Sequence, residues 1–456
     1  MLTKVFDAFV EASPVSVMAR GLAERLLDAD KLDAWFESVD SSQYTRELPF
    51  SAVFSLMSQV VCGSQKSINA AYQSAKEEVP TSIVSVYNKL KGIEVQTSAG
   101  LVRYAAGEAT VLIEELEGAV PERLPGYRVK LLDGNCLAAS EHRIKELRAT
   151  SAGPLPGKSL VVLDPALHLP IDVFPCEDGH TQERALFGAV LDTVESNDVW
   201  IADRNFCTLG FLSGIAKAQG YFVIREHKNL PWEAVPSSKL IAAGKVDTGK
   251  VYQQRVEIVD EQGNTLRLRR VKLTLNKATR DGDRIIYILT NLPVRAASAR
   301  KIAELYRGRW TIETAFQELT LHLNSEINAL GYPRAALFGF CVALVAYIIM
   351  AVLKAALRSV HGAQNIEDNF SGYYLADELS GIYRGMMITI PDSRWVVFSR
   401  LTQSQLIELL KALAAKVNLP RFQKHRRGPK KPAKKRKTDK RTPHVSTARV
   451  IASRKR

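Results

Sequence analysis

The spacing of apolar and polar positions divides the chain into a helical first part, a strand-rich middle part and a helical last part. In the first part apolar residues recur with the spacing of amphipathic helices. Short apolar runs bounded by turn residues follow, and long helical patterns then return. The pattern predicts an N-terminal helical domain at 1–125, an α/β core at 126–227 plus 284–332, and a C-terminal helical region at 333–420.

The middle part predicts, in chain order, three strands, a helix, a strand, a helix and a strand. This order is typical of an α/β core built on a mixed sheet. The first strand, "YRVKLL", is expected to end at Asp133, and the fourth, "VWIA", near Asp203. Residues 228–283 alternate between apolar and polar on both sides of a Gly263–Asn264 turn, which predicts a β-rich insertion containing a hairpin.

The stretch "YRGRWTIETAFQELT" combines two helical stripes, with Gly308 as a candidate break. Tyr306, Arg309 and Glu313 fall on one side at helical spacing. The other side is apolar, and we expect it to be buried; it consists of Ile312, Phe316, Leu319 and Leu323. A carboxylate beside an arginine and a tyrosine is compatible both with a solvated surface and with a catalytic site.

A long uncharged run, Ala335–Leu353, passes the length test for a membrane span. It is rich in alanine, and Lys354 and Arg358 continue its helical pattern. A central helix buried on all sides gives the same signal, and the pattern favours that interpretation over a membrane anchor.

Charge is concentrated at the C-terminal end. Residues 421–456 contain 16 Lys and Arg against one acidic residue, so the preceding 420 residues hold 62 − 16 = 46 basic and 48 − 1 = 47 acidic residues. Such a segment is too charged to pack, so we predict a disordered basic tail whose partner is nucleic acid. A solubilising or membrane-surface tail is the alternative.

The five cysteines are scattered and form no CxxC pair. Cys176 and His180 have only loose metal-ligand spacing, so neither a zinc finger nor a disulfide framework is expected. Asp7 and Glu11 interrupt the apolar pattern of the N-terminus, unlike a signal peptide. We therefore expect a cytoplasmic protein.

Two aspartates lie where a buried strand runs into polar sequence: Asp133 before Gly-Asn and Asp203 before Arg-Asn. Strand ends at one edge of an α/β sheet converge on a crevice. Singly, such an aspartate most often forms a turn, and Asp164 has nearly the same local sequence. Together with Glu313, however, converging carboxylates would suit Mg²⁺ or Mn²⁺, and two such ions can cleave phosphodiesters.

These residues resemble those of bacterial insertion-sequence transposases with an Asp-Asp-Glu triad, specifically the large family with a Tyr-x2-Arg-x3-Glu-x6-Lys signature. Tyr306, Arg309 and Glu313 match it in type and spacing, whereas Thr320 stands where the lysine is expected. "LLDGNC" and "IADRNF" are similar to the motifs around the family's two aspartates. The resemblance covers roughly residues 126–360.

The resemblance implies an RNase H-like catalytic core with an inserted β-rich subdomain, acting in cut-and-paste DNA transposition. Asp133, Asp203 and Glu313 would be catalytic and would ligate two Mg²⁺ ions, with Mn²⁺ as a substitute. DNA contacts are expected from five further residues: Tyr306, Arg309, Trp310, Arg307 and Arg143. For Arg143 a solvated helix start is the competing interpretation.

The expected partner is double-stranded DNA, both the inverted-repeat ends of the element and the target, with the 1–125 domain as a candidate for binding the ends. A homodimer is expected because two ends must be paired, and no membrane is expected. Two other hypotheses remain open: a catalytically inactive DNA-binding relative, supported by Thr320, and a protein anchored in a membrane by residues 335–353.

Overall fold

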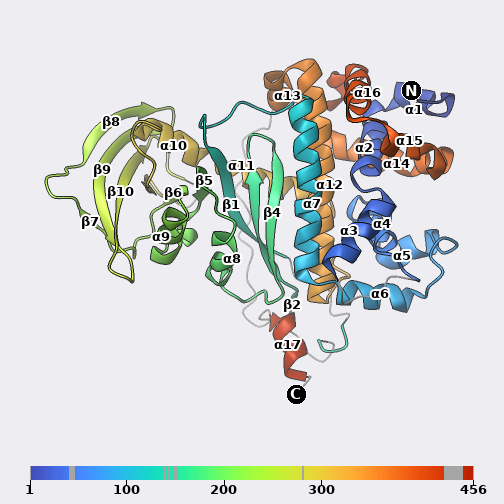
Figure 1. Cartoon of the computed structure of the whole chain (residues 1–456), viewed down its shortest axis with the longest axis horizontal. Coiled ribbons are helices and arrows are strands. Elements are labelled where there is room, and N and C mark those ends of the chain that lie inside the picture. Colours follow the sequence, from blue (N-terminus) through green and yellow to red (C-terminus); the bar gives the residue numbers. More distant parts are fainter. Residues whose placement is uncertain are drawn as a thin grey trace.

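The computed structural model is built around a ten-stranded mixed sheet with helices on both faces (Figure 1). It describes residues 2–40, 47–137, 140, 144–147, 153–279, 282–425 and 445–454. The strands of the central sheet are β1 (Arg128–Cys136), β3 (Lys158–Asp164), β4 (Leu169–Cys176), β5 (Asp198–Ala202), β6 (Tyr221–Arg225), β7 (Glu233–Ala234), β8 (Ile241–Val246), β9 (Gly249–Val259), β10 (Thr265–Leu275) and β11 (Ile285–Thr290). The short strands β2 (Pro154–Leu155) and β12 (Val445–Ser446) pair separately.

The α-helices fall into three groups along the chain. The first group precedes the sheet: α1 (Asp7–Ala12), α2 (Pro14–Leu26), α3 (Ala29–Val39), α4 (Phe50–Val61), α5 (Ile68–Ser74), α6 (Ile83–Gly92) and α7 (Val95–Glu115). The second is interleaved with the sheet or follows it directly: α8 (Phe187–Leu191), α9 (Leu209–Lys217), α10 (Ala299–Arg307) and α11 (Trp310–His322). The third closes the chain: α12 (Pro333–His361), α13 (Ala363–Asn369), α14 (Gly372–Thr389), α15 (Asp392–Arg400), α16 (Gln403–Ala415) and α17 (Thr447–Arg454).

The sheet has the order β4-β3-β1-β5-β6-β11-β10-β9-β7, with β8 also paired to β9. Strands β1, β5 and β6 are parallel neighbours, and the other pairs are antiparallel. The stretch predicted as a β-rich insertion, 228–283, therefore extends the central sheet: β10 pairs with β11, β9 pairs with β10, and β7 and β8 pair with β9. In Figure 1 this extension curls away at the side opposite α7 and α12, with α10 beside it.

The alternation of side chains along each strand gives the sheet two separately packed faces. In β5, Val199 and Ile201 join the core formed with α7, α10, α11 and α12. The residues that alternate with them, Trp200 and Ala202, join a second core that contains Phe211 of α9 and Phe187 of α8. Because both faces are covered, the strand is apolar from Val199 to Ala202, after the aspartate that begins it, as expected for parallel strands between helices.

Helix α12 is the centre of the helical part. It lies beside α7 (Figure 1) and also packs against α2, α4, α6 and α16, so helices from both ends of the chain pack around it. Within the described residues α12 is the one helix long and apolar enough to cross a membrane, but 83% of its most apolar stretch is buried inside the protein. Burial on all sides explains the uncharged run without a membrane.

Two elements differ from the sequence-based expectations, and a third agrees with them. Strand β1 continues past Asp133 to Cys136, because β3 still pairs with it after β5 has ended. The helix predicted between the third and fourth strands forms only a 3₁₀ turn (Glu183–Leu186) and the short α8. The segment 299–323 is two helices, and the predicted break at Gly308 is confirmed.

The C-terminal segment also differs in part. We predicted disorder throughout 421–456, but β12 pairs in parallel with β2, and α17 follows it. Ser446 and Thr447 are buried there, and the Arg449 guanidinium contacts the Asp178 carboxylate at 2.5 Å. Tertiary contacts order this end of the chain because its residues are less uniformly charged than the lysine-rich run before it. That run, 426–444, lies outside the described residues.

Candidate active site

The two aspartates lie together at one edge of the sheet because of strand pairing. Parallel pairing between β1 and β5 ends at Leu132 and Ala202, which directly precede Asp133 and Asp203. Each aspartate is two residues beyond a side chain of the α11-facing core, Leu131 and Ile201 respectively. By the period of two along a strand, both carboxylates are directed toward the face that α10 and α11 cover.

The matched signature residues are divided between two helices. Tyr306 lies in the last turn of α10, Arg309 is the residue that precedes α11, and Glu313 lies in the first turn of α11. A single continuous helical stripe, as the sequence pattern suggested, is therefore not what holds them. The apolar side of α11 is buried as predicted at Ile312 and Leu319, with Phe316 partly buried, and α11 packs against β1.

Arg309 connects two of the three acids. Its Nη1 atom donates to Asp133 Oδ2 at 2.9 Å, and its Nη2 atom donates to Glu313 Oε1 at 2.6 Å. The arginine is 8% exposed, whereas the side chain of Glu313 is 45% exposed. A guanidinium has a planar fork of donors, so one buried cation holds a sheet carboxylate and a helix carboxylate at a set separation.

Tyr306 connects the third acid to the same helix junction. Its hydroxyl donates to Asp203 Oδ1 at 3.4 Å, a long hydrogen bond. Burial, with the nearby charge of Asp203 adding to it, raises the pKa of Tyr306 to about 12. The phenol therefore stays protonated at neutral pH and acts as a donor beside Asp203.

Asp133 is the most perturbed of the three acids. Burial raises its pKa to about 6, against the lowering effects of the Arg309 guanidinium and of the Gly134 amide, which donates to Asp133 Oδ1 at 2.9 Å. The negative charges of Glu313 and Asp203 add to the rise, so the three acids lie in one electrostatic neighbourhood.

For the expected role of Asp133 as a metal ligand, its raised pKa predicts a pH dependence of metal binding. A metal ligand must be ionised, and a pKa above the usual value means that the proton competes below about pH 6. We expect the affinity for Mn²⁺ to be constant above pH 7 and to fall up to about tenfold per pH unit below pH 6. Calorimetric titration with Mn²⁺ from pH 5 to 8 measures this, and equal affinity at pH 7.5 and pH 5.2 would contradict it.

The donor chemistry of the site fits a hard divalent cation, because all three acids supply carboxylate oxygens. Within the described residues, however, no three acidic, histidine or cysteine side chains converge closely enough to hold a metal ion by themselves. Asp133, Asp203 and Glu313 are instead connected through Arg309 and Tyr306. Binding a metal would draw these carboxylates closer together.

Gly134 lies beside a fourth acid that the sequence did not single out. A Cβ atom at residue 134 would overlap the carboxylate of Glu183, which lies in the 3₁₀ turn before α8. The Asp-Gly pair within β1 is therefore approached by a carboxylate from the other sheet face. By contrast, Asp164 is a turn former, since its Oδ1 accepts from the amides of Ala166 and Leu167.

The other predicted DNA-contacting residues lie around this centre. Trp310 is 49% exposed. Arg307 is exposed and lies 3.6 Å from the Asp247 carboxylate in the β8–β9 turn. Thr320 is exposed near the end of α11, where its hydroxyl donates to the Phe316 carbonyl. Arg143 lies outside the described residues.

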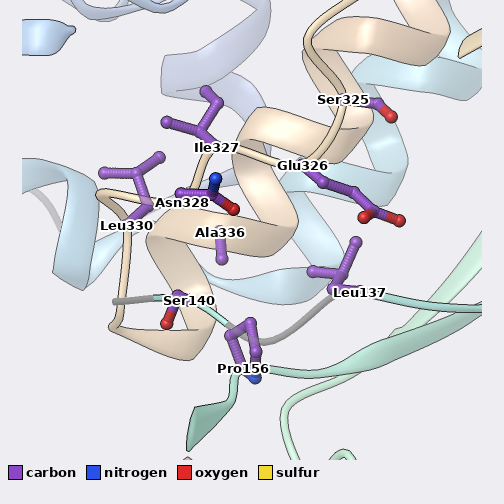
Figure 2. Close-up of a pocket in the computed structure, with 9 residues that line it drawn as sticks. All are labelled: Leu137, Ser140, Pro156, Ser325, Glu326, Ile327, Asn328, Leu330 and Ala336. Carbon is purple, nitrogen blue, oxygen red and sulfur yellow. The ribbon is translucent and has the colours of Figure 1, made fainter. Parts of the chain in front are cut away.

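Two hollows lie elsewhere, between the core and the helical part. Figure 2 shows the smaller one, beyond the end of β1, where Leu137 faces the segment that leads into α12. A larger hollow of about 480 Å³ lies between α5, α6 and the same segment. Neither includes any of the three acids, so the candidate site is an edge of the sheet and not part of either pocket.

Comparison with known proteins found a family match over the part of the chain that contains the candidate site. Residues 125–349 match the transposase DDE domain family, and this span contains all three acids. The chain is 30% identical over 165 residues to a Sinorhizobium fredii protein named as a transposase, y4zB, and 27% identical over 172 residues to a Synechocystis protein named as a transposase for the insertion sequence element IS4SA. Each alignment covers 36% of this chain and less than half of the relative, 44% and 43% respectively.

These matches identify the class to which the domain belongs: the DDE transposases, which act in DNA recombination. More particularly, the relatives that the chain matches are named as transposases, one of them for an insertion sequence element.

Proposed function

We propose that the protein is the transposase of an insertion sequence, which cleaves DNA at the element ends in a Mg²⁺-dependent reaction and joins the strands to target DNA. The observation that carries the proposal is the Arg309 bridge between Asp133 and Glu313, with the Tyr306–Asp203 contact beside it. Residues from two sheet strands and two helices thus surround one edge within the matched domain.

The strand arrangement supports an RNase H-like reading of the core. The two aspartates follow adjacent parallel strands in a mixed sheet, and the glutamate comes from a helix packed on one face. The insertion between Asp203 and Glu313 supplies the added strands β7–β10 and leaves this arrangement undisturbed.

In this proposal Asp133, Asp203 and Glu313 would hold two Mg²⁺ ions, with Mn²⁺ able to substitute. When bound, such ions supply an activated water or 3′-hydroxyl and stabilise the leaving oxygen of an in-line displacement. Arg309 would position the DNA backbone, because its planar guanidinium suits phosphate as well as carboxylate. The protonated hydroxyl of Tyr306 would donate a hydrogen bond to an oxygen of the DNA backbone. Trp310 would offer an exposed ring on which an unpaired base can stack.

The proposed partners are double-stranded DNA of the inverted-repeat ends and of the target, bound by a homodimer because the two ends must be held together. The basic segment 421–456 would add sequence-independent affinity for phosphates, which weakens as salt is raised. The proposed location is the cytoplasm, at the nucleoid.

The experiment is a cleavage assay on a duplex carrying the inverted repeat that flanks the reading frame. We expect nicking at the repeat boundary with Mg²⁺ or Mn²⁺ and none with EDTA. The alternative is a catalytically inactive DNA-binding relative, and one observation favours it: Thr320 offers no cation to a phosphate. Binding of the end duplex with no cleavage in either metal would support that alternative.

A further inference from the structure

Arg123 makes two contacts that span the junction between α10 and α11. It lies in the segment between α7 and β1, far from the junction in sequence. Its Nη1 atom donates to the Gly308 carbonyl at 2.8 Å, and its Nη2 atom donates to Thr311 Oγ1 at 2.8 Å. Gly308 ends α10 and Thr311 lies in the first turn of α11, so one guanidinium holds both helices.

The backbone at this junction is a tight turn. The amides of Arg309, Thr311 and Ile312 each donate to the carbonyl three residues earlier, instead of four as in an α-helix. The Gly308 carbonyl accepts from the Thr311 amide and also from Arg123. Because Tyr306, Arg309 and Glu313 lie before, within and after this turn, its geometry sets the relative positions of all three side chains.

Gly308 leaves room for the Arg123 guanidinium, whereas its own backbone conformation does not demand a glycine. Its φ of −63° and ψ of −14° are ordinary right-handed helical values that any residue adopts. A Cβ atom at this position, however, would overlap Arg123 Nη1 and come within 3.0 Å of Arg123 Cζ. The Tyr-Arg-Gly-Arg sequence therefore makes room for a guanidinium from another part of the chain.

The environment of Arg123 indicates that it is placed for these two contacts. Burial lowers the pKa of Arg123, with the charge of Asp164 opposing the shift. Its two side-chain hydrogen bonds within the described residues go to a carbonyl and a hydroxyl. Burying a guanidinium costs free energy, which these two hydrogen bonds partly offset.

We propose that Arg123 is a positioning residue of the transposase site. It holds the α10–α11 turn so that the Tyr306 hydroxyl meets Asp203 while the Arg309 guanidinium meets Asp133. This inference rests on the proposed function, and it adds a residue outside the matched signature. If Arg123 merely stabilised the fold, its loss would lower the unfolding temperature without changing the chemistry of the folded protein.

The test compares Arg123→Ala, Arg123→Lys and Gly308→Ala with the full-length protein. For Arg123→Ala we expect kcat for Mn²⁺-dependent cleavage of the end duplex to fall about 10- to 100-fold, the range seen when groups that orient metal ligands are lost. The KM for DNA should change less than about threefold. Lysine should restore little, because one ammonium cannot replace two parallel donors. Gly308→Ala should reproduce the kcat loss, because its methyl group displaces the guanidinium.

Two further measurements make the result specific. Added guanidinium ion should partly rescue Arg123→Ala and should not rescue Gly308→Ala, in which the space is filled. Amide hydrogen exchange of a peptide covering residues 306–313 should be faster in both variants than in wild type. The matched control is Arg103→Ala, which removes an arginine paired with Asp172 on another part of the core.

The outcomes separate the two levels of inference. Unchanged exchange at 306–313 together with unchanged kcat in folded Arg123→Ala would overturn the role of Arg123. The role would also be overturned if the fall in kcat were fully explained by a smaller fraction of folded Arg123→Ala molecules. A wild-type protein without metal-dependent cleavage would contradict the proposed function, and the exchange comparison would still decide whether Arg123 holds the turn.

Discussion

Replacing Asp203 by asparagine is expected to lower the rate of Mg²⁺-dependent cleavage of the end duplex by about a thousandfold or more. Losing a carboxylate ligand removes several kcal/mol of charge stabilisation from the transition state, and about 4 kcal/mol corresponds to a factor of a thousand. Asparagine keeps the size of the side chain and an oxygen that can still accept from the Tyr306 hydroxyl. The fold and the binding of the duplex should therefore survive.

The measurement is single-turnover cleavage at saturating enzyme, with the unfolding temperature taken alongside. The matched control is Asp164→Asn, because Asp164 also ends a buried apolar run but its Oδ1 accepts from two amides of its own turn. That variant should cleave at close to the wild-type rate, since an asparagine oxygen accepts the same two bonds. If Asp203→Asn kept more than about a tenth of the wild-type rate, the assignment of the three acids would be wrong.

Replacing Arg309 by alanine is expected to have the second largest effect, a loss of about a hundredfold or more in cleavage. Hydrogen bonds to charged groups contribute about 1.5–3 kcal/mol each, and Arg309 makes one to Asp133 and one to Glu313. The bond to Glu313 counts for less, because that carboxylate is 45% exposed and screened by water. The bond to Asp133 counts for more, because its loss leaves a buried carboxylate without its cation.

A second readout distinguishes Arg309 from a residue that only binds DNA. Arg309 lowers the pKa of Asp133, so without it this pKa should rise further above 6. The acid limb of the pH–rate profile should then move to higher pH, and lysine at position 309 should correct the shift only in part. The control is Arg267→Ala, which removes an 84% exposed side chain on β10. An unchanged pH profile in Arg309→Ala would contradict the bridging role.

Much of the candidate site could be predicted from local sequence because its parts obey local rules. An apolar run followed by Asp predicts a strand end, and parallel strands bring such ends together. For Asp203 the strand ends as predicted, at Ala202; for Asp133 only the parallel pairing with β5 ends there, while β1 itself continues to Cys136. Asp164 shows the limit of the rule, since the same local sequence there produces only a turn.

Other features could not be predicted because they depend on contacts between distant segments. Nothing near Arg123 in the sequence indicates that it spans the α10–α11 turn. Nothing near Gly134 indicates that Glu183 approaches it. The extension of β1 to Cys136 requires a partner strand, β3, that begins more than twenty residues later.

By itself the sequence determined the α/β core, the helical regions on either side, the break at Gly308 and the family signature, because side-chain periodicity and backbone preference act over a few residues. Only the tertiary structure decided how the signature is used. It divides Tyr306 and Glu313 between two helices, and it places the Arg309 guanidinium between a sheet acid and a helix acid. Such pairings depend on the close approach of elements far apart in the chain, which burial and packing set and local spacing does not.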